Sequence, residues 1–169
     1  MNKYREIKAT ELNENVFDLI GHQWMLVTAG SKDKYNTMTA SWGAMGILFN
    51  KPIAIIFIRP QRYTFGFLEK NDTFTLSVLP ETYRKALNIC GSKSGKDCDK
   101  IKEAGLTPLS TELGNMAFEE ARLILECKKI YGQFLDPKAF YDQSLIPANF
   151  PKNDFHKVYI AEISKVWTK

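Results

Sequence analysis

Cysteine and histidine are scarce in this chain of 169 residues, which has three cysteines and two histidines. The cysteines form no Cys-x-x-Cys pair, so we expect neither a disulfide scaffold nor a closed zinc site. Two histidines are too few for a histidine-rich metal site, and no bound metal is expected. Cys90, Cys98 and Cys127 are most simply interpreted as buried thiols.

Long apolar runs and a strong charge of one sign are also lacking. No run approaches the roughly 18 residues of a membrane-spanning helix, and no apolar signal core follows Met1 to Glu6. The 23 basic and 19 acidic residues give a net charge of +4 without a basic stripe, which does not indicate nucleic-acid binding. We therefore expect a cytoplasmic globular protein that binds neither membranes nor nucleic acid, folded as a single domain over residues 1–169.

The familiar catalytic and nucleotide-binding motifs are absent as well. Gly-x-Ser-x-Gly, His-Glu-x-x-His and Gly-x-Gly-x-x-Gly do not occur. The segment Gly91 to Asp97 looks like a phosphate loop, but one residue is missing between its glycines, and Asp97 stands where Ser or Thr would hold Mg²⁺. With no catalytic triad and no metal set, any difficult chemistry would belong to a cofactor.

What the chain does contain is apolar periodicity, mostly of strand type. We expect strands over residues 24–28, 37–42, 53–58, 73–78, 121–133 and 157–167, and helices over 10–20, 61–70, 82–90 and 96–103. Residues 31–36 are expected to form a polar turn. Because the regular strand–helix alternation of a parallel sheet is missing, the pattern favours a mainly β fold, an antiparallel barrel with helices at its margins.

Residues 136–154 form a long segment with three prolines among aromatic residues. A loop of this length in a compact domain is usually functional or disordered, and the aromatic residues favour packing over disorder. The segment is interpreted either as a covering flap or, slightly preferred, as a wall of a ligand pocket.

Three polar segments are suited to binding phosphate. Asn36 to Gly43 is rich in small hydroxylated residues at a strand end, where backbone N–H groups stay open to a ligand. Arg59 to Thr64 places two cations and a hydroxyl before a helix, whose N-terminus favours an anion. Ser92 to Lys96 also precedes an expected helix. Each segment alone is explained by strand residues, solvated charges or a helix cap, whereas together they suggest a small phosphorylated ligand.

The same segments resemble those of a known family. Asn36-x-Met38-Thr39-Ala40-Ser41-Trp42-Gly43, Arg59-Pro60-x-Arg62-Tyr63-Thr64, Phe74-Thr75-Leu76, Ser94-Gly95-Lys96-Asp97 and His156 before Tyr159 to Ile163 are similar, in this order, to the flavin reductase-like family of FMN-binding split barrels. Its flavoredoxin branch is the most similar. Two departures concern the outer pocket: Ala161 stands where many members have Gly, and Asn153 to His156 reads Asn-Asp-Phe-His rather than Gly-Asp-His.

The resemblance implies a six-stranded antiparallel split barrel, a homodimer, and one FMN per subunit near the dimer interface. Along the isoalloxazine ring and ribityl chain it places Asn36, Thr39, Ala40, Ser41 and Trp42. Toward the phosphate it places Arg59, Arg62, Tyr63, Thr64, Ser94, Gly95 and Lys96. It places His156, the one candidate catalytic residue, near the ring or an incoming nicotinamide. These side chains suit FMN, whose phosphate needs cations and donors and whose flat ring needs an apolar wall.

Several alternatives remain open at this point. Trp42 is also explained as a core tryptophan, and His156 as a structural hydrogen-bonding group. The protein is expected to be an FMN-dependent oxidoreductase that oxidises NAD(P)H; alternatively, it is a flavoredoxin-like electron carrier for a redox-protein partner, or it binds flavin without turnover. The missing dinucleotide fingerprint favours FMN over FAD. Apolar residues such as Ile47, Leu48 and Phe49 need cover, which also predicts a homodimer.

Overall fold

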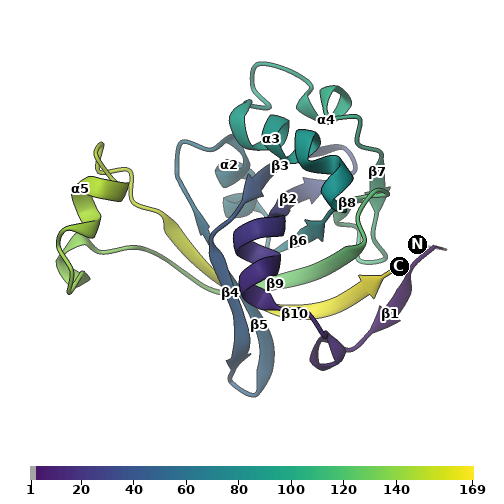
Figure 1. The fold of residues 1–169 in the computed structure, drawn as a ribbon, viewed down its shortest axis with the longest axis horizontal. Coiled ribbons are helices and arrows are strands. Elements are labelled where there is room, and N and C mark those ends of the chain that lie inside the picture. The colour runs from purple at the N-terminus through teal and green to yellow at the C-terminus, as the bar shows by residue number, and fades with distance from the viewer. Residues whose placement is uncertain (1–2) are drawn as a thin grey trace.

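The structure of the chain, a computed structural model, describes residues 3–169. Its centre is an antiparallel sheet of eight strands in the hydrogen-bonded order β3-β2-β6-β9-β10-β5-β4, with β1 paired to β10 (Figure 1). The strands are β1 (Arg5–Ile7), β2 (Met25–Ser31), β3 (Lys34–Ala40), β4 (Gly43–Leu48), β5 (Lys51–Ile58), β6 (Thr73–Val78), β9 (Leu123–Phe134) and β10 (Lys157–Thr168). A separate two-stranded sheet pairs β7 (Pro108–Ser110) with β8 (Met116–Phe118).

β3 and β4 are neighbours in the chain but stand at opposite ends of this hydrogen-bonding order. Only Ser41 and Trp42 separate them, and the two strands pair with β2 and β5, respectively. The curled sheet therefore stays open along a seam between β3 and β4, which confirms the predicted mainly β, antiparallel split barrel. It has eight strands where six were expected, because β1 is short and the half-exposed β4 lacks an alternating apolar pattern.

Alternate residues of the central strands feed two apolar clusters. On β2, Val27 belongs to the cluster inside the barrel with Leu76 and Leu125, whereas Leu26 belongs to a second cluster between the sheet and α3. Strand residues point to opposite faces in turn, so a strand that is buried on both sides can serve two cores. This explains why β2 is buried over almost its whole length.

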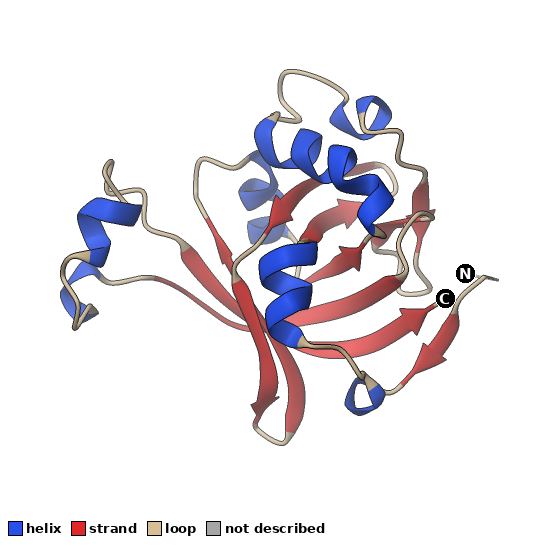
Figure 2. Ribbon diagram, viewed as in Figure 1, coloured by secondary structure: helices blue, strands red, loops and turns tan. Residues whose placement is uncertain are grey.

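Helical segments cover the sheet rather than alternating with its strands (Figure 2). They are η1 (Ala9–Glu11), α1 (Val16–Asp18), η2 (Leu19–Gln23), α2 (Tyr63–Lys70), η3 (Glu81–Tyr83), α3 (Arg84–Ser92), α4 (Lys100–Glu103), η4 (Pro137–Ala139) and α5 (Leu145–Asn149). α2 and α3 contact β2 and β3, and α1 continues directly into η2 as one helical segment. No helix within residues 3–169 is long and apolar enough to cross a membrane.

Residues 135–156, which we call the arm, project away from the barrel between β9 and β10 (Figure 1). The arm is not a structureless loop, because it contains η4 and α5. Phe140, Phe150 and Phe155 pack together with ring centroids 4.8 to 6.3 Å apart. This packing agrees with the expectation that the aromatic residues of the segment order it.

Some expected elements were wrong at their ends. The helix predicted over 10–20 is broken, because the Asn15 side chain accepts hydrogen bonds from two backbone N–H groups and begins a new helix at Val16. The helix predicted over 96–103 begins only at Lys100, where Asp99 caps it. The polar turn predicted over 31–36 is shorter, since β3 already starts at Lys34. Local side-chain caps and strand pairing overrode the apolar pattern in these places.

Candidate functional site

The seam between β3 and β4 opens into a hollow of about 220 Å³, which we call the seam hollow. Its walls bring together predicted residues from three distant segments: Thr39, Ala40, Ser41, Trp42, Arg59, Arg62 and His156. Phe57 of β5 also lines it and was not predicted for the site. In the sequence Phe57 belongs to an apolar strand, which by itself indicates only a core position.

A larger, mostly apolar hollow of about 770 Å³, the apolar hollow, adjoins the seam hollow and shares Ser41, Trp42, Phe57 and His156 with it. Its other walls come from α1, η2, β4 and the arm, and include Val16, Phe17, Ile20, Met45, Leu135 and Phe150. In the sequence these positions are ordinary apolar residues, which cannot be distinguished from core residues, so they were not predicted as part of the site. Trp42 is 49% exposed, which excludes the interpretation of this residue as a core tryptophan.

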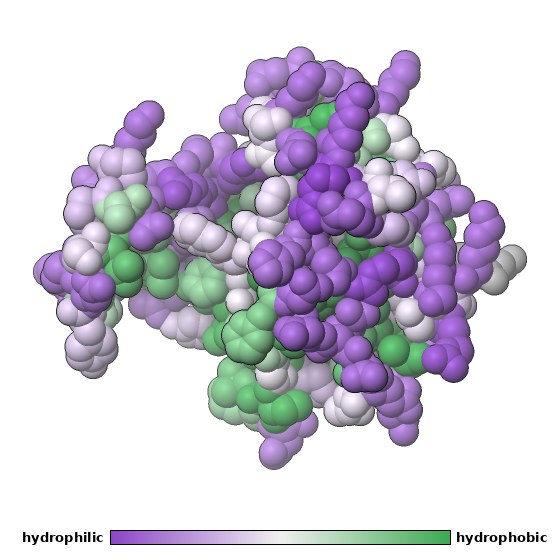
Figure 3. Space-filling model, in the orientation of Figure 1, coloured by the Kyte–Doolittle hydropathy of each residue, from purple (hydrophilic) through white to green (hydrophobic). Residues whose placement is uncertain are grey.

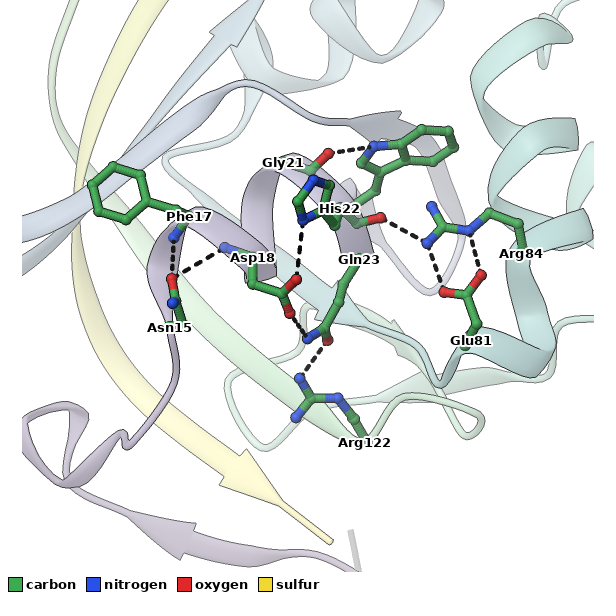
Figure 4. A network of polar contacts seen from close by, with 10 residues as sticks. Asn15, Phe17, Asp18, Gly21, His22, Gln23, Glu81, Arg84 and Arg122 are labelled. Carbon is green, nitrogen blue, oxygen red and sulfur yellow. Dashed lines mark hydrogen bonds and ion pairs between the residues drawn. The ribbon is translucent and has the colours of Figure 1, made fainter.

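A polar network holds α1 and η2 in place as one wall of the apolar hollow (Figure 4). Asp18 accepts hydrogen bonds from Gln23 at 2.6 Å and from His22 at 3.1 Å, and these bonds lower the pKa of Asp18. Gln23 in turn accepts from Arg122 at 2.6 Å, and Arg84 donates to the backbone carbonyl of His22 at 2.6 Å. The helical segment is thus tied to two other parts of the fold.

On its other side the seam hollow continues toward cationic residues. Arg62 also lines a pocket of about 490 Å³ along α2, the α2 pocket. Lys96 lines both this pocket and a fourth space of about 410 Å³, the loop hollow, which is also lined by Asn36 and Gly95. Shared wall residues therefore place the four spaces side by side, and we call this row of hollows the groove; one end of it is apolar, and the other carries Arg62 and Lys96, with Asp97 and Asp99 in the loop hollow.

The cationic end depends on a close approach between the loop after α3 and β3. A Cβ atom added at Gly95 would overlap Asn36 Oδ1 and lie 3.1 Å from Asn36 Cγ and 3.2 Å from Tyr63 Cδ1. Asn36 is buried and donates to Thr64 Oγ1 at 2.7 Å, so it has little room to move. Only glycine fits at position 95, and this packing brings Lys96 to 5.6 Å from the centroid of the Tyr63 ring.

Arg62 and Lys100 share the carboxyl end of α3. Arg62 Nη1 donates to the carbonyl of Gly91 at 2.6 Å, and Lys100 Nζ donates to the carbonyls of Cys90 and Lys93 at 3.3 and 3.2 Å. Free carbonyls at a helix C-terminus carry partial negative charge and attract cations. Burial lowers the pKa of both Arg62 and Lys100. The two cations therefore anchor α3 and the loop that carries Lys96; sequence reasoning did not include Lys100 in the site.

The polar contacts of Arg59 are with residues of the arm. It forms an ion pair with Asp154 and donates to the carbonyl of Asn149 at 2.8 Å. Gln61 donates to the same carboxylate at 2.6 Å, and these contacts hold the pKa of Asp154 below its usual range despite the opposing effect of desolvation. The charge of Arg59 is thus balanced inside the protein, although its side chain still lines the seam hollow.

His156 lies where the arm rejoins the barrel and is only 7% exposed. Its ring centroid is 5.3 Å from that of Trp42 and 5.5 Å from that of Phe150. Burial, reinforced by Arg59 and opposed by Asp154, lowers the pKa of His156 to about 4. Its buried Nδ1 has no hydrogen-bond partner within residues 3–169. His156 is therefore a neutral imidazole with one unused polar atom at the wall shared by two hollows.

The remaining predicted residues have structural contacts. Thr39 Oγ1 donates to the carbonyl of Leu87 at 2.5 Å, which ties β3 to α3. Thr64 is fully buried beneath Asn36. Ser94 accepts from the backbone N–H of Lys96 at 3.2 Å and shapes the loop, but it does not precede a helix as expected.

Comparison with known proteins adds independent findings. The family model described as Flavin reductase like domain matches residues 17–169. No curated protein is similar enough in sequence to be called a relative. An FMN-binding domain of flavin reductases-like enzyme from Shewanella baltica superposes with a TM-score of 0.70 at 18% identity, covering 98% of this chain and 76% of that one.

Two further solved structures have the same fold. Flavoredoxin from Methanosarcina acetivorans has a TM-score of 0.67 at 21% identity, and the matched region covers 96% of this chain and 76% of the flavoredoxin chain. An NADH:FAD oxidoreductase from Streptomyces globisporus has a TM-score of 0.64 at 18% identity, covering 87% and 74%, respectively.

The open antiparallel barrel with a groove at its seam defines the class of this molecule as a split barrel. The family match over nearly the whole chain makes the assignment specific: the protein belongs to the flavin reductase-like domain family. The resemblance drawn from the sequence motifs is thereby confirmed.

Proposed function

We propose that the protein is an FMN-dependent oxidoreductase of the flavin reductase type, which binds FMN noncovalently in the groove and transfers hydride or electrons from NAD(P)H through it. One observation carries the proposal. The groove joins an apolar hollow beside Trp42 to a cationic end at Arg62 and Lys96. This is the order of properties along FMN, from the flat ring to the phosphate.

The side chains at each end of the groove fit the corresponding part of FMN. The linings of the seam hollow and the α2 pocket contain Arg62, Lys96 and Tyr63 and no carboxylate. A phosphate monoester carries about −1.5 to −2 charges near pH 7, so these cations suit it, whereas Asp97 and Asp99 line the adjoining loop hollow. At the other end Trp42 and Phe57 offer apolar surface, and His156 lines the same hollow with a neutral imidazole.

When bound, FMN would supply the hydride and electron transfer, and the residues of the chain would bind and orient it. Arg62 and Lys96 would hold the phosphate, while Ser41 and the backbone N–H groups at the end of β3 would face the ring and ribityl chain. Donors aimed at the ring edge where negative charge develops favour the reduced form. His156, neutral at pH 7, would make a hydrogen bond to the ring or to the nicotinamide rather than act as an acid.

A flavoredoxin-like electron carrier is the second candidate, and the arm favours it. Leu135 and Phe150 line the apolar hollow, and Arg59 fastens the arm to the barrel through Asp154. A nicotinamide must stack on an open face of the flavin. Leu135 and Phe150, where they cover this face, would slow oxidation of NAD(P)H and leave a redox-protein partner as the source or destination of electrons.

We also propose that two copies of the chain associate through the hairpin of β4 and β5. Ile47 and Phe49 at its tip are 67% and 75% exposed, and hydrophobic side chains gather there in the space-filling view (Figure 3). Exposed apolar patches of this kind mark interaction sites, and β4 is an edge strand with free backbone groups.

The visible spectrum of the purified protein tests the proposed function. After addition of FMN and gel filtration, the protein should be yellow, and NADH or NADPH added without oxygen should bleach it rapidly. Bleaching only by dithionite or a reduced partner protein supports the carrier instead. A matched pair of variants strengthens the test: Lys96→Ala should retain less FMN, whereas Lys138→Ala on the exposed arm should retain as much as the unmodified chain. A protein that gains no colour from FMN refutes both candidates.

A further inference from the structure

Only two barrel residues hold the arm in place through polar contacts. Within residues 3–169, the hydrogen bonds and ion pairs between residues 136–155 and the barrel come from Arg59 and Gln61. Arg59 pairs with Asp154 and donates to the carbonyl of Asn149 at 2.8 Å, and Gln61 donates to Asp154 at 2.6 Å. We call these three contacts the clamp. It fixes the part of the arm that returns toward β10.

The clamp encloses Phe150, which lies between its two arm residues in the chain. Phe150 is buried, yet it belongs to neither of the two apolar clusters of the core. Its ring centroid lies 5.7 Å from the Arg59 guanidinium and 5.5 Å from the centroid of the His156 ring. Because Phe150 has no place in the core, its position depends on the clamp and on the aromatic residues of the arm.

The clamp can open without disturbing the core. Both donors converge on one oxygen of Asp154, Oδ2, and the buried Oδ1 has no hydrogen-bond partner within the described part of the chain. An unpaired buried acceptor offsets part of what a charged pair contributes to stability. Opening the clamp therefore gives up little, and it breaks no contact within either apolar cluster.

Phe150 occupies space that a second planar ring would need. It lines the apolar hollow together with Trp42 and Phe57, so its ring faces the same space as theirs. A phenyl ring and the six-membered ring of nicotinamide have nearly the same size and shape. Withdrawal of Phe150 would leave room for one such ring, whereas the clamped Phe150 itself offers the stacking surface that a flat apolar ring prefers.

We propose that Phe150 is a specificity-determining residue of the apolar hollow: the clamp holds its ring in the place of a second planar ring, and a nicotinamide enters only when the clamp opens. Asp154 is the positioning residue of this device. The inference rests on the proposed function, because it takes the ring of FMN to occupy the hollow. It also names the feature that decides between an enzyme that oxidises NAD(P)H and an electron carrier.

Pulsed electron paramagnetic resonance tests the clamp in the full chain without FMN. Spin labels are placed on Ala148→Cys, beside the clamp, and on Ser164→Cys of β10, both at exposed positions. Cys98 is replaced by serine, and the buried Cys90 and Cys127 remain. Labelled protein is diluted with unlabelled protein, so that only distances within one chain are measured. The clamped chain should give one narrow distribution of distances.

Variants of the arm then separate the clamp from the rest of the arm. Asp154→Ala should open the clamp about ten- to a hundredfold more often and add a population at other distances. Asp142→Ala is the matched control, because Asp142 lies in the same arm but accepts hydrogen bonds from Ser144 alone. It should leave the distances unchanged. Asp154→Asn keeps an oxygen acceptor for Gln61 without the charge and should give an intermediate result.

Stopped-flow reduction of FMN-loaded protein by NADH and NADPH tests the role of Phe150. A site that is open for only a fraction of the time has an apparent Kd raised by the inverse of that fraction. Asp154→Ala should therefore lower the apparent Kd of the nucleotide about ten- to a hundredfold and leave the limiting rate within about twofold. Phe150→Ala, which removes the ring itself, should lower it as much, and Asp142→Ala should not change it.

The outcomes distinguish failure of this inference from failure of the proposed function. Unchanged distances in Asp154→Ala overturn the clamp. A moved arm with an unchanged apparent Kd, or no reduction by either nucleotide in both Asp154→Ala and Phe150→Ala, overturns the role of Phe150 while FMN binding stands. A chain that binds no FMN overturns the proposed function, and with it the role of Phe150.

Discussion

Replacement of Gly95 by alanine tests the packing that brings Lys96 to the cationic end of the groove. The added methyl group would overlap the Asn36 amide oxygen and press on Tyr63. Asn36 can yield only by giving up its 2.7 Å hydrogen bond to Thr64, because both residues are buried. Otherwise the loop must move away from β3 and take Lys96 with it.

The free-energy cost of either response can be estimated. Leaving a buried donor unpaired costs about 1–3 kcal/mol, and forcing an extra methyl group into a packed site costs a similar amount. We expect Gly95→Ala to lower the free energy of unfolding by about 1–3 kcal/mol and the affinity for FMN by about ten- to a hundredfold. Gly46→Ala is the matched control, since its added Cβ would meet nothing within 4 Å.

Urea unfolding monitored by tryptophan fluorescence and fluorescence titration with FMN measure the two quantities. The double variant Asn36→Ala and Gly95→Ala removes the overlapping amide, so its effects should be smaller than the sum of the single effects. If Gly95→Ala matches Gly46→Ala in both stability and FMN affinity, the close approach of loop and strand does not hold the site together.

Three other predictions concern single residues. Lys96→Ala should weaken FMN binding about ten- to a hundredfold, and stopped-flow reduction with saturating FMN should recover most turnover; a variant that stays inactive when loaded would give the lysine a role in the chemistry. Because the pKa of His156 is lowered from 6.5 to about 4, the unfolded chain binds this proton more tightly, so stability should fall as the pH drops from about 6.5 to about 4, by up to ~1.4 kcal/mol per pH unit. In urea unfolding across that range His156→Gln should show a shallower fall, and an unchanged slope would contradict the assignment. Phe49→Glu should yield a monomer of 19.3 kDa in light scattering at micromolar concentration, where the unmodified chain should be a dimer; equal masses would exclude this interface.

Six strands, β2, β3, β5, β6, β9 and β10, could be predicted from the sequence because each contains its own signal. Residues 53–58 are a β-branched apolar run, and residues 73–78 match β6 at both ends, where Asp72 precedes the strand and Pro80 follows closely after it. β1 and β4 could not be predicted in this way. β1 is three residues long and forms by pairing with the end of β10, whereas β4 is half-exposed and folds back on β5.

The candidate site likewise has features that the sequence predicts and features that only the fold reveals. Its polar residues are recognisable in the sequence because hydroxyls, glycines and cations follow one another in short segments that match a family pattern. Which partners they take is a tertiary matter. Arg59 looks like a phosphate ligand in the sequence, yet the fold places it against Asp154, 95 residues away in the chain. The fold also places Lys100 on carbonyls at the end of α3.

The sequence by itself therefore determined the strand-rich class, the family and the residue types of the candidate site, since these depend on local pattern. Only the tertiary structure decided that the apolar and cationic segments line adjoining hollows of one groove. It also decided that His156 is buried and neutral. The physical reason is that cavities, desolvation and charge pairing arise from contacts between distant segments, which a linear pattern of residues does not specify.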